Sequence, residues 1–316
     1  MQPLSRFTRC RSILVPWVVM FATTAPSQAG PQPKLPPIYS TTIDGNKQIT
    51  EALVVAQREN KRVLLQFGAN WCVWCHRLHE VFKTNEPIAK TLAFEYEWVL
   101  MDVEEVNGKR HNEDVVERYG NPTKHGLPVI VLLDSDGKPL ATQETSSWEV
   151  GEGYDTSQVA SFLDQWKPKP VSAERTLAEA MSAARSADKR LFVYFAAPWC
   201  GFCHHLTALM FDGQTGPVLQ SAYVPVMIDI ERMTGGKELA EKYGRKEDDG
   251  LPFWVILDTA GKTLTDSRGE KGNVGFPVEP FEVAHFMKVI RSTAPKLTPP
   301  QREALETALK KPDQAG

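Results

Sequence analysis

The chain has 316 residues, of which 42% are hydrophobic and 24% are charged, and its formal net charge is −3 at pH 7. This composition excludes a chain that is disordered throughout, and the length leaves room for two globular domains. The small acidic excess lacks the basic character of nucleic-acid-binding proteins, so we expect no nucleic-acid partner.

Residues 1–29 have the pattern of a signal peptide. Three arginines within the first eleven residues precede an apolar stretch, residues 13–22, and small residues follow at Ser27 and Ala29. The apolar stretch is shorter than the roughly 20 residues that a membrane span needs. We therefore predict an exported, periplasmic protein; the alternatives are secretion, or anchoring to the membrane by an uncleaved signal.

Cys10 lies before the apolar stretch and would leave with the signal peptide. The mature chain would then hold four cysteines in two pairs. An exported protein can keep such pairs as disulfides, because the compartments outside the cytoplasm are oxidising.

Proline-rich breaks divide the remaining chain. Residues 30–39 form a leader that we predict to be a spacer. A second break at 167–171 reads as a linker, and a third opens a proline-rich, helical and polar tail at 295–316. These breaks frame two units, residues 40–166 and residues 172–294.

The two units repeat the same elements in the same order. Apolar residues at helical spacing predict a helix at the start of each unit, and they are Ile49, Ala52, Leu53 and Ala56, then Leu177, Ala180, Met181 and Ala184. Apolar, β-rich runs at 63–67 and 191–195 then predict buried strands.

Further elements follow in parallel in both units. A helical stretch, a strand ending in Asp102 or Asp229 and a second helix come first. After Gly-Leu-Pro, the predicted strands and closing helices are 129–133 and 156–165 in the first unit, and 253–257 and about 279–292 in the second. Each late strand ends at an Asp-containing turn.

A Cys-x-x-Cys pair directly follows the first strand of each unit, Cys72 with Cys75 and Cys200 with Cys203. At the start of a helix, the first sulfur faces unpaired backbone N–H groups and the positive end of the helix dipole, and both favour the thiolate. We therefore predict thiol–disulfide exchange, with Cys72 and Cys200 as nucleophiles and Cys75 and Cys203 as the resolving thiols.

A tryptophan precedes and a histidine follows each pair; these residues are Trp71 and His76, then Trp199 and His204. We expect the tryptophans to shield the sulfurs, with ordinary core residues as the alternative. The histidines can tune the thiolate by their charge, and solvated histidines without a role are the alternative.

Each unit resembles a thioredoxin-fold domain, on the strength of Trp-Cys-x-x-Cys and the later Gly-Leu-Pro, and the resemblance covers nearly all of residues 40–294. It implies an α/β fold of two tandem domains, each a central mixed sheet flanked by helices. It also implies that Pro128 and Pro252 are cis and that they line, with Leu127 and Leu251, the groove for a substrate strand. The whole chain is most similar to exported tandem thioredoxin-like proteins of thiol:disulfide interchange.

The sequence departs from that family at two buried positions of each unit. An acid and a lysine often stand there, and this chain has Gln66 and Trp98 in the first unit and Tyr194 and Pro225 in the second. Exchange should persist, because a thiolate can form without the acid, but it should be slower or use another base. We predict that Asp102 and Asp229 are structural and do not replace it.

The dipeptides between the cysteines also differ. Val73-Trp74 is bulky and apolar, whereas Gly201-Phe202 is nearer the glycine-containing pairs of reducing thioredoxins. We therefore expect two different reduction potentials. An electron relay between the units would require the sites to face each other, because the linker spans only about 15 Å.

The residues leave three other functions open. Cys-x-x-Cys-His is also the attachment motif of a c-type haem, a pair with its histidine could handle metal, and a thioredoxin-like scaffold can bind without redox chemistry. The favoured hypothesis is an exported thiol:disulfide oxidoreductase, more reductase or isomerase than strong oxidase, with no cofactor and no metal. Its partners would be exported proteins with cysteines and an unidentified thiol electron donor or acceptor.

Overall fold

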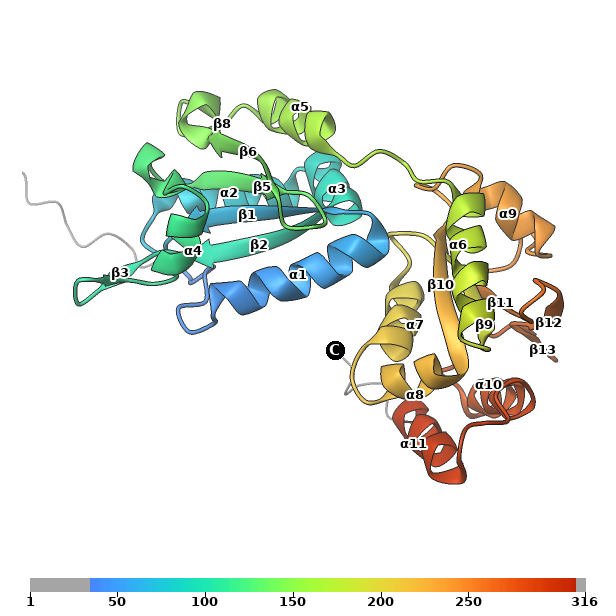
Figure 1. Ribbon diagram of the computed structural model, residues 1–316. Helices are drawn as coiled ribbons and strands as arrows, with labels where there is room; N and C mark the ends of the chain where they lie inside the picture. Colours follow the sequence, from blue (N-terminus) through green and yellow to red (C-terminus); the bar gives the residue numbers. More distant parts are fainter. Residues whose placement is uncertain (1–34, 311–316) are drawn as a thin grey trace, which may run out of the picture. The chain divides into compact units, whose positions relative to one another are not determined.

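The computed structural model describes residues 35–310. The predicted signal peptide, Cys10, the first part of the leader and the end of the tail lie outside the described residues. The first repeat contains α1 (Gly45–Glu59), β1 (Arg62–Gly68), α2 (Val73–Thr84), α3 (Glu86–Glu95), β2 (Tyr96–Asp102), β3 (Glu105–Val106), β4 (Lys109–Arg110), α4 (Glu113–Arg118), η1 (Pro122–His125), β5 (Val129–Leu133), β6 (Pro139–Glu144), η2 (Thr145–Trp148), β7 (Glu149–Val150), β8 (Gly153–Tyr154) and α5 (Thr156–Trp166) (Figure 1).

The second repeat has the same order of main elements, followed by one more helix. Its elements are α6 (Ala173–Ser186), β9 (Arg190–Ala196), α7 (Gly201–Phe211), α8 (Thr215–Ala222), β10 (Tyr223–Asp229), α9 (Gly236–Lys242), β11 (Phe253–Leu257), β12 (Thr263–Asp266), β13 (Arg268–Gly269), β14 (Gly272–Asn273), α10 (Pro280–Thr293) and α11 (Pro299–Leu309).

Each repeat is built on a four-stranded mixed sheet of the same topology. The strand orders are β2-β1-β5-β6 and β10-β9-β11-β12. The central strand pairs in parallel with one neighbour and antiparallel with the other, β1 with β2 and β5, and β9 with β10 and β11. All residues of β5 and β11 are buried, as expected for strands that are covered by helices on both faces.

Helices cover both faces of the first sheet, because successive strand residues point to opposite sides. On one face Leu65 belongs to a buried cluster with residues of α1 and α4, such as Ala56. On the other face Leu64 belongs to a cluster with α2, α3 and α5, including Leu78. The predicted fold class, a mixed sheet flanked by helices in each repeat, is confirmed.

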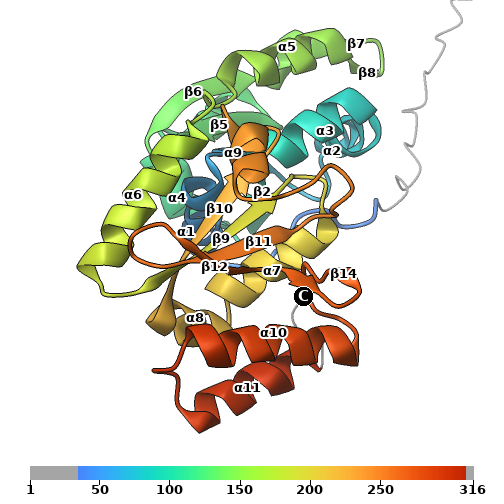
Figure 2. The same ribbon diagram turned by 90° about the vertical axis from the view of Figure 1, so that its right-hand side faces the viewer.

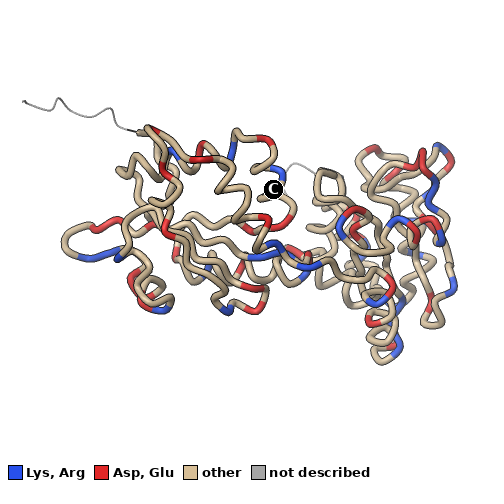
Figure 3. The backbone as a smooth tube through the Cα atoms, turned by 90° about the horizontal axis from the view of Figure 1, so that it is seen from above, with Lys and Arg blue, Asp and Glu red and all other residues tan. Residues whose placement is uncertain are grey.

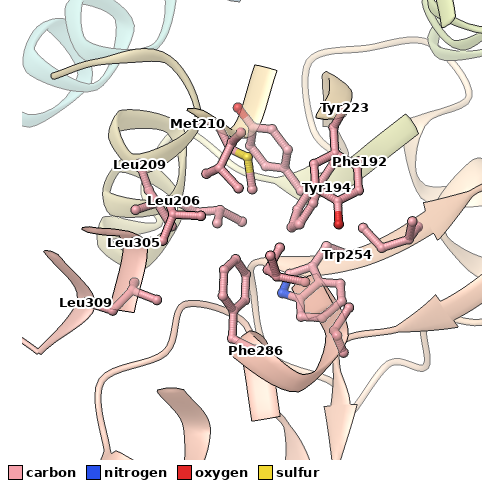
Figure 4. Close-up of a cluster of buried hydrophobic side chains, with 14 of the residues drawn as sticks. Phe192, Tyr194, Leu206, Leu209, Met210, Tyr223, Trp254, Phe286, Leu305 and Leu309 are labelled. Carbon is pink, nitrogen blue, oxygen red and sulfur yellow. The ribbon is translucent and has the colours of Figure 1, made fainter. Parts of the chain in front are cut away.

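An aromatic core fills one side of the second sheet (Figure 4). Trp254 of β11 is fully buried and lies 5.3 Å from the Phe192 ring and 5.8 Å from the Phe286 ring, centroid to centroid. Leu305 and Leu309 of α11 belong to the same cluster, and α11 lies alongside α10 (Figure 2). The tail that we predicted to be polar therefore carries a helix that completes the core.

The main elements lie where the sequence predicted them, with local differences. The single helical stretch expected after each cysteine pair is two helices. In the first repeat Asn85 causes the break, because its side chain accepts the Ile88 N–H and caps α3. The leader is not only a spacer, since Tyr39 at its end is buried to 3% exposure.

Basic and acidic residues are interspersed along the chain in both repeats (Figure 3). Of the helices between residues 35 and 310, none has the length and apolar character to cross a membrane.

Candidate dithiol sites

Both Cys-x-x-Cys pairs lie at the start of the helix that follows the central strand. Cys72 is the N-cap of α2, and its Sγ accepts the backbone N–H of Cys75 at 3.1 Å. Cys200 caps α7 in the same way, with the N–H of Cys203 at 3.1 Å. The first sulfur of each pair is therefore at the positive end of a helix, as its place in the sequence predicted.

Each pair forms a disulfide, with a Cα–Cα distance of 5.2 Å in both repeats. Cys72 and Cys200 keep 5% of their surface exposed, whereas Cys75 is fully buried and Cys203 is 3% exposed. Cys72 is therefore more accessible than its partner, whereas the two cysteines of the second pair are almost equally buried.

The leucines of the two Leu-Pro dipeptides pack against the clusters that contain the disulfides. The Leu127–Pro128 and Leu251–Pro252 peptide bonds are cis. Leu127 packs against a buried cluster that contains Cys72 and Cys75, and Leu251 packs against the cluster that contains Cys200 and Cys203. In the first repeat a segment distant in the sequence thus meets the dithiol, and in the second it packs against the larger cluster that contains the dithiol.

The two tryptophans that precede the pairs are at the surface. Trp71 is 65% exposed and Trp199 is 61% exposed, which rules out the alternative that they are ordinary core residues. The Trp199 indole N–H donates to Glu231 at 2.7 Å.

The two histidines close the turn before each pair. His76 Nε2 lies 2.9 Å from the carbonyl oxygen of Asn70, and His204 Nε2 lies 2.9 Å from that of Pro198. Because a carbonyl oxygen can only accept, Nε2 is the protonated nitrogen in both rings. This bond would have to break before Nε2 could bind a haem iron.

The dipeptides between the cysteines lie in different surroundings. Trp74 is half-buried, packs edge-on against the Tyr154 ring at 5.3 Å, and lies beneath the Arg77 guanidinium. Phe202 is 54% exposed and faces Phe276 at a centroid distance of 6.5 Å. The two dithiols thus differ in the apolar surface beside them.

Amide and phenol groups occupy the positions where the family often has a buried acid. Gln66 is fully buried, and its Oε1 accepts the Trp98 indole N–H at 3.1 Å. Its Nε2 donates to the Tyr39 hydroxyl at 2.9 Å. In the second repeat, the buried Tyr194 hydroxyl pairs with Thr207 at 3.0 Å.

The aspartates at the ends of β2 and β10 form local contacts. Asp102 pairs with His111 at 2.8 Å, and Asp229 accepts the backbone N–H groups of Glu231 and Arg232, each at 2.9 Å. Burial raises the pKa of Asp229 despite those bonds. Both contacts close the turn after the strand, which supports the structural role predicted for these residues.

Tyr39 is the residue near the first dithiol that the sequence analysis missed. It belongs to one buried cluster with Cys72 and Cys75. The Asn70 side chain donates a hydrogen bond to the Tyr39 carbonyl and holds the residue there. A tyrosine in a proline-rich leader gives no signal of such a contact in the sequence.

Gly68 leaves the room that Tyr39 occupies. A Cβ at Gly68 would overlap the Tyr39 hydroxyl and lie 2.8 Å from Cys75 Sγ. Gly68→Ala should therefore lower the free energy of unfolding by about 1–3 kcal/mol, measured by urea denaturation. Gly201→Ala is the matched control, because a Cβ there meets nothing within 4 Å; an equal loss in both variants would refute this account of Gly68.

The described residues show no built metal site: between residues 35 and 310 no group of three or more His, Cys, Asp or Glu side chains could hold a metal ion.

Comparison with known families places both repeats in one group. Residues 45–135 match a family described as thioredoxin-like, and residues 177–271 match a family described as a thioredoxin-like domain. Each match includes the central strand, the Cys-x-x-Cys pair and the Leu-Pro of its repeat. The chain belongs to the thioredoxin superfamily and carries two tandem thioredoxin-like domains.

Several proteins are similar to parts of the chain. The protein disulfide-isomerase tigA of Aspergillus niger is 24% identical over 230 residues, which are 70% of this chain and 59% of that protein. The thiol:disulfide interchange protein DsbD of Actinobacillus pleuropneumoniae is 25% identical over 118 residues, 37% of this chain and 18% of that protein. This chain thus spans less than two thirds of the length of either relative.

Among solved structures, the crystal structure of a disulphide isomerase from Xylella fastidiosa Temecula1 is 27% identical. The match covers 42% of this chain and 97% of that one, with a TM-score of 0.36.

Proposed function

We propose that this chain is an exported thiol:disulfide oxidoreductase that exchanges dithiol and disulfide with cysteine-containing proteins at two sites. The observation that carries the proposal is the duplicated geometry: in each repeat the first cysteine caps a helix with its sulfur, the partner cysteine lies buried inside that helix, and the leucine of a Leu-Pro dipeptide packs against the cluster that contains both. Cys72, Cys75, Cys200 and Cys203 are the proposed reactive residues.

The proposed reduction of a substrate disulfide has two steps. The Cys72 or Cys200 thiolate attacks one substrate sulfur, so that the substrate S–S bond breaks, a mixed disulfide forms and one substrate thiolate leaves. The Cys75 or Cys203 thiolate then attacks the first cysteine, closes the internal disulfide and releases the second substrate thiolate. Two electrons pass from the enzyme dithiol to the substrate, and the reverse sequence oxidises a substrate dithiol.

Other residues would position the substrate at the surface. We propose that Leu127 with Pro128, and Leu251 with Pro252, form the groove for a substrate strand. The exposed Trp71 and Trp199 would cover the sulfurs from outside. His76 and His204, which close the turn before each pair, would hold the first cysteine at the helix end.

The proposed direction is reduction or isomerisation more than strong oxidation, because Gly201-Phe202 resembles the pairs of reducing thioredoxins. The proposed compartment is the periplasm, with an unidentified thiol partner that supplies or accepts electrons. The named activities of the relatives, disulfide isomerisation and thiol:disulfide interchange, agree with this proposal. We further propose that the two domains span residues 40–166 and 172–294 and are joined by a linker at 167–171, with Tyr39 packed against the first domain and α11 packed against the second.

Trapping of the mixed disulfide tests the proposal. In Cys75→Ser and Cys203→Ser variants of the mature protein, the first cysteine can attack but nothing resolves the product. We therefore expect each variant, mixed in its reduced form with an oxidised cysteine-containing protein, to accumulate a covalent adduct at Cys72 or Cys200, seen by non-reducing electrophoresis and peptide mass spectrometry.

The Cys72→Ser and Cys200→Ser variants are the matched controls, because they lose the same internal disulfide but keep the buried cysteine. They should accumulate little adduct, since the remaining thiol lies inside the helix and not at its N-cap, where the thiolate is favoured. If neither resolving-cysteine variant forms an adduct, the proposed exchange reaction is wrong.

A further inference from the structure

A short segment before the first helix holds a tyrosine beside the first dithiol. Ile38 and Tyr39, here called the strap, donate both backbone N–H groups to the Asn70 side-chain oxygen, at 2.8 and 2.9 Å. The Asn70 amide nitrogen donates in return to the Tyr39 carbonyl at 3.0 Å. One side chain thus ties the strap to the turn that leads into Cys72.

The Tyr39 side chain points into the molecule, toward the disulfide. The residue is buried in one cluster with Cys72 and Cys75. A Cβ built on Gly68 would overlap the Tyr39 hydroxyl and lie 2.8 Å from Cys75 Sγ, so both groups are close to the same point. Gly68 is the last residue of β1, so the missing side chain of one strand residue makes room for the phenol beside the sulfur.

The hydrogen-bond network fixes which groups donate. The Trp98 indole can only donate, so the oxygen of the Gln66 amide faces it and the nitrogen faces Tyr39. The Tyr39 oxygen therefore accepts from Gln66 and still has its own hydrogen to donate. Burial raises the pKa of the Tyr39 phenol, so the hydroxyl keeps this hydrogen through the range in which thiols titrate.

The second repeat has none of these parts. At the constant spacing that pairs Cys72 with Cys200, the counterparts of Tyr39, Asn70, Gln66 and Gly68 are Lys167, Pro198, Tyr194 and Ala196. Lys167 is exposed and pairs with Asp164. Ala196 has the Cβ that Gly68 lacks. The arrangement of strap, glycine and glutamine is therefore specific to the first dithiol.

We propose that Tyr39 is a positioning residue of the first dithiol: its hydroxyl donates a hydrogen bond to Cys75 Sγ in the reduced protein and thereby sets the reduction potential of that site apart from the second. A donor to sulfur favours the reduced form, in which sulfur carries more negative charge, over the disulfide. Tyr39 thus makes the first site more oxidising than it would otherwise be. This inference rests on the proposed redox function.

The test measures the midpoint potential of each dithiol in the full mature chain. Wild type and variants are equilibrated in graded thiol buffers, alkylated, and analysed by mass spectrometry of the two Cys-x-x-Cys peptides. Tyr39→Phe removes only the hydroxyl. It should lower the midpoint of the first site by about 30 mV, a tenfold change in the exchange equilibrium, and leave the second site unchanged.

Two more variants make the result decisive. Tyr194→Phe removes the buried phenol of the second repeat and should leave the first midpoint unchanged, since Tyr194 bonds to Thr207. Asn70→Ala releases the strap while it keeps the Tyr39 phenol, and it should shift the first midpoint in the same direction as Tyr39→Phe. It also serves as the deciding variant if Tyr39→Phe does not fold.

An unchanged or higher first midpoint in the folded variants would overturn the role of Tyr39. Equal shifts at both sites would do the same, because they would indicate a general loss of structure. If neither wild-type dithiol titrates, the proposed redox function is wrong, and the inference is wrong with it. If both wild-type dithiols titrate and the first midpoint potential of the variants is unchanged, only the inference is wrong.

Discussion

Replacing both Cys72 and Cys200 with serine is expected to reduce disulfide reductase activity to the rate of the chemical reductant alone. These two cysteines cap the helices of the two sites with their sulfurs. A serine hydroxyl in the same place is not ionised near neutral pH and cannot attack a disulfide as a thiolate does. Either single variant should retain the turnover of the other site.

Insulin reduction with dithiothreitol as the electron source measures this loss. The matched control is the variant with both Cys75 and Cys203 replaced by serine, which loses the same two internal disulfides but keeps the attacking sulfurs. Circular dichroism should show both double variants folded, and only the control should form mixed disulfides with insulin. Activity of the Cys72→Ser, Cys200→Ser protein equal to wild type would contradict the assignment of the nucleophiles.

Trp254→Ala should destabilise the second repeat by about 3–5 kcal/mol, the usual cost of removing a large buried aromatic side chain. Trp254 is fully buried against Phe192 and Phe286, and its indole N–H donates to the Gly275 carbonyl at 2.7 Å. The substitution would leave a cavity next to β11 and an unpaired carbonyl oxygen.

Urea unfolding with hydrogen exchange of peptides from β9 and β11 localises this effect. Trp199→Ala is the control of the same residue type in the same repeat, and it should change stability by no more than about 0.5 kcal/mol because Trp199 is largely exposed. If the two variants unfold at the same urea concentration as wild type, the packing role of Trp254 is wrong.

Much of the fold could be predicted because its elements repeat and have strong local signals. Strands β5 and β11 occupy the predicted residues, since unbroken apolar runs bounded by Leu-Pro and an Asp turn are unambiguous. Helix α11 was predicted as part of a polar tail, although Leu305 and Leu309 are buried. Leu305 and Leu309 are the two buried residues of this eleven-residue helix. Two apolar positions are too weak a pattern to predict burial.

The candidate sites were predictable in part, for a physical reason. The cysteines and Leu-Pro dipeptides are marked by short motifs, and the fold brings them together. Tyr39 lies near the first dithiol because the Asn70 side chain binds its backbone and because Gly68 has no side chain in the place of its hydroxyl. Such a contact depends on three-dimensional proximity between segments that share no pattern, so sequence periodicity does not indicate it.

The most direct test of the account is the pair of midpoint potentials of the wild-type mature protein, each read from its own Cys-x-x-Cys peptide after equilibration in graded thiol buffers. We predict that both dithiols titrate reversibly and at different potentials. The second should lie nearer the value of about −270 mV of a reducing thioredoxin than the value of about −120 mV of a strong oxidase. If neither pair opens and closes across that range, the chain is not a thiol:disulfide oxidoreductase.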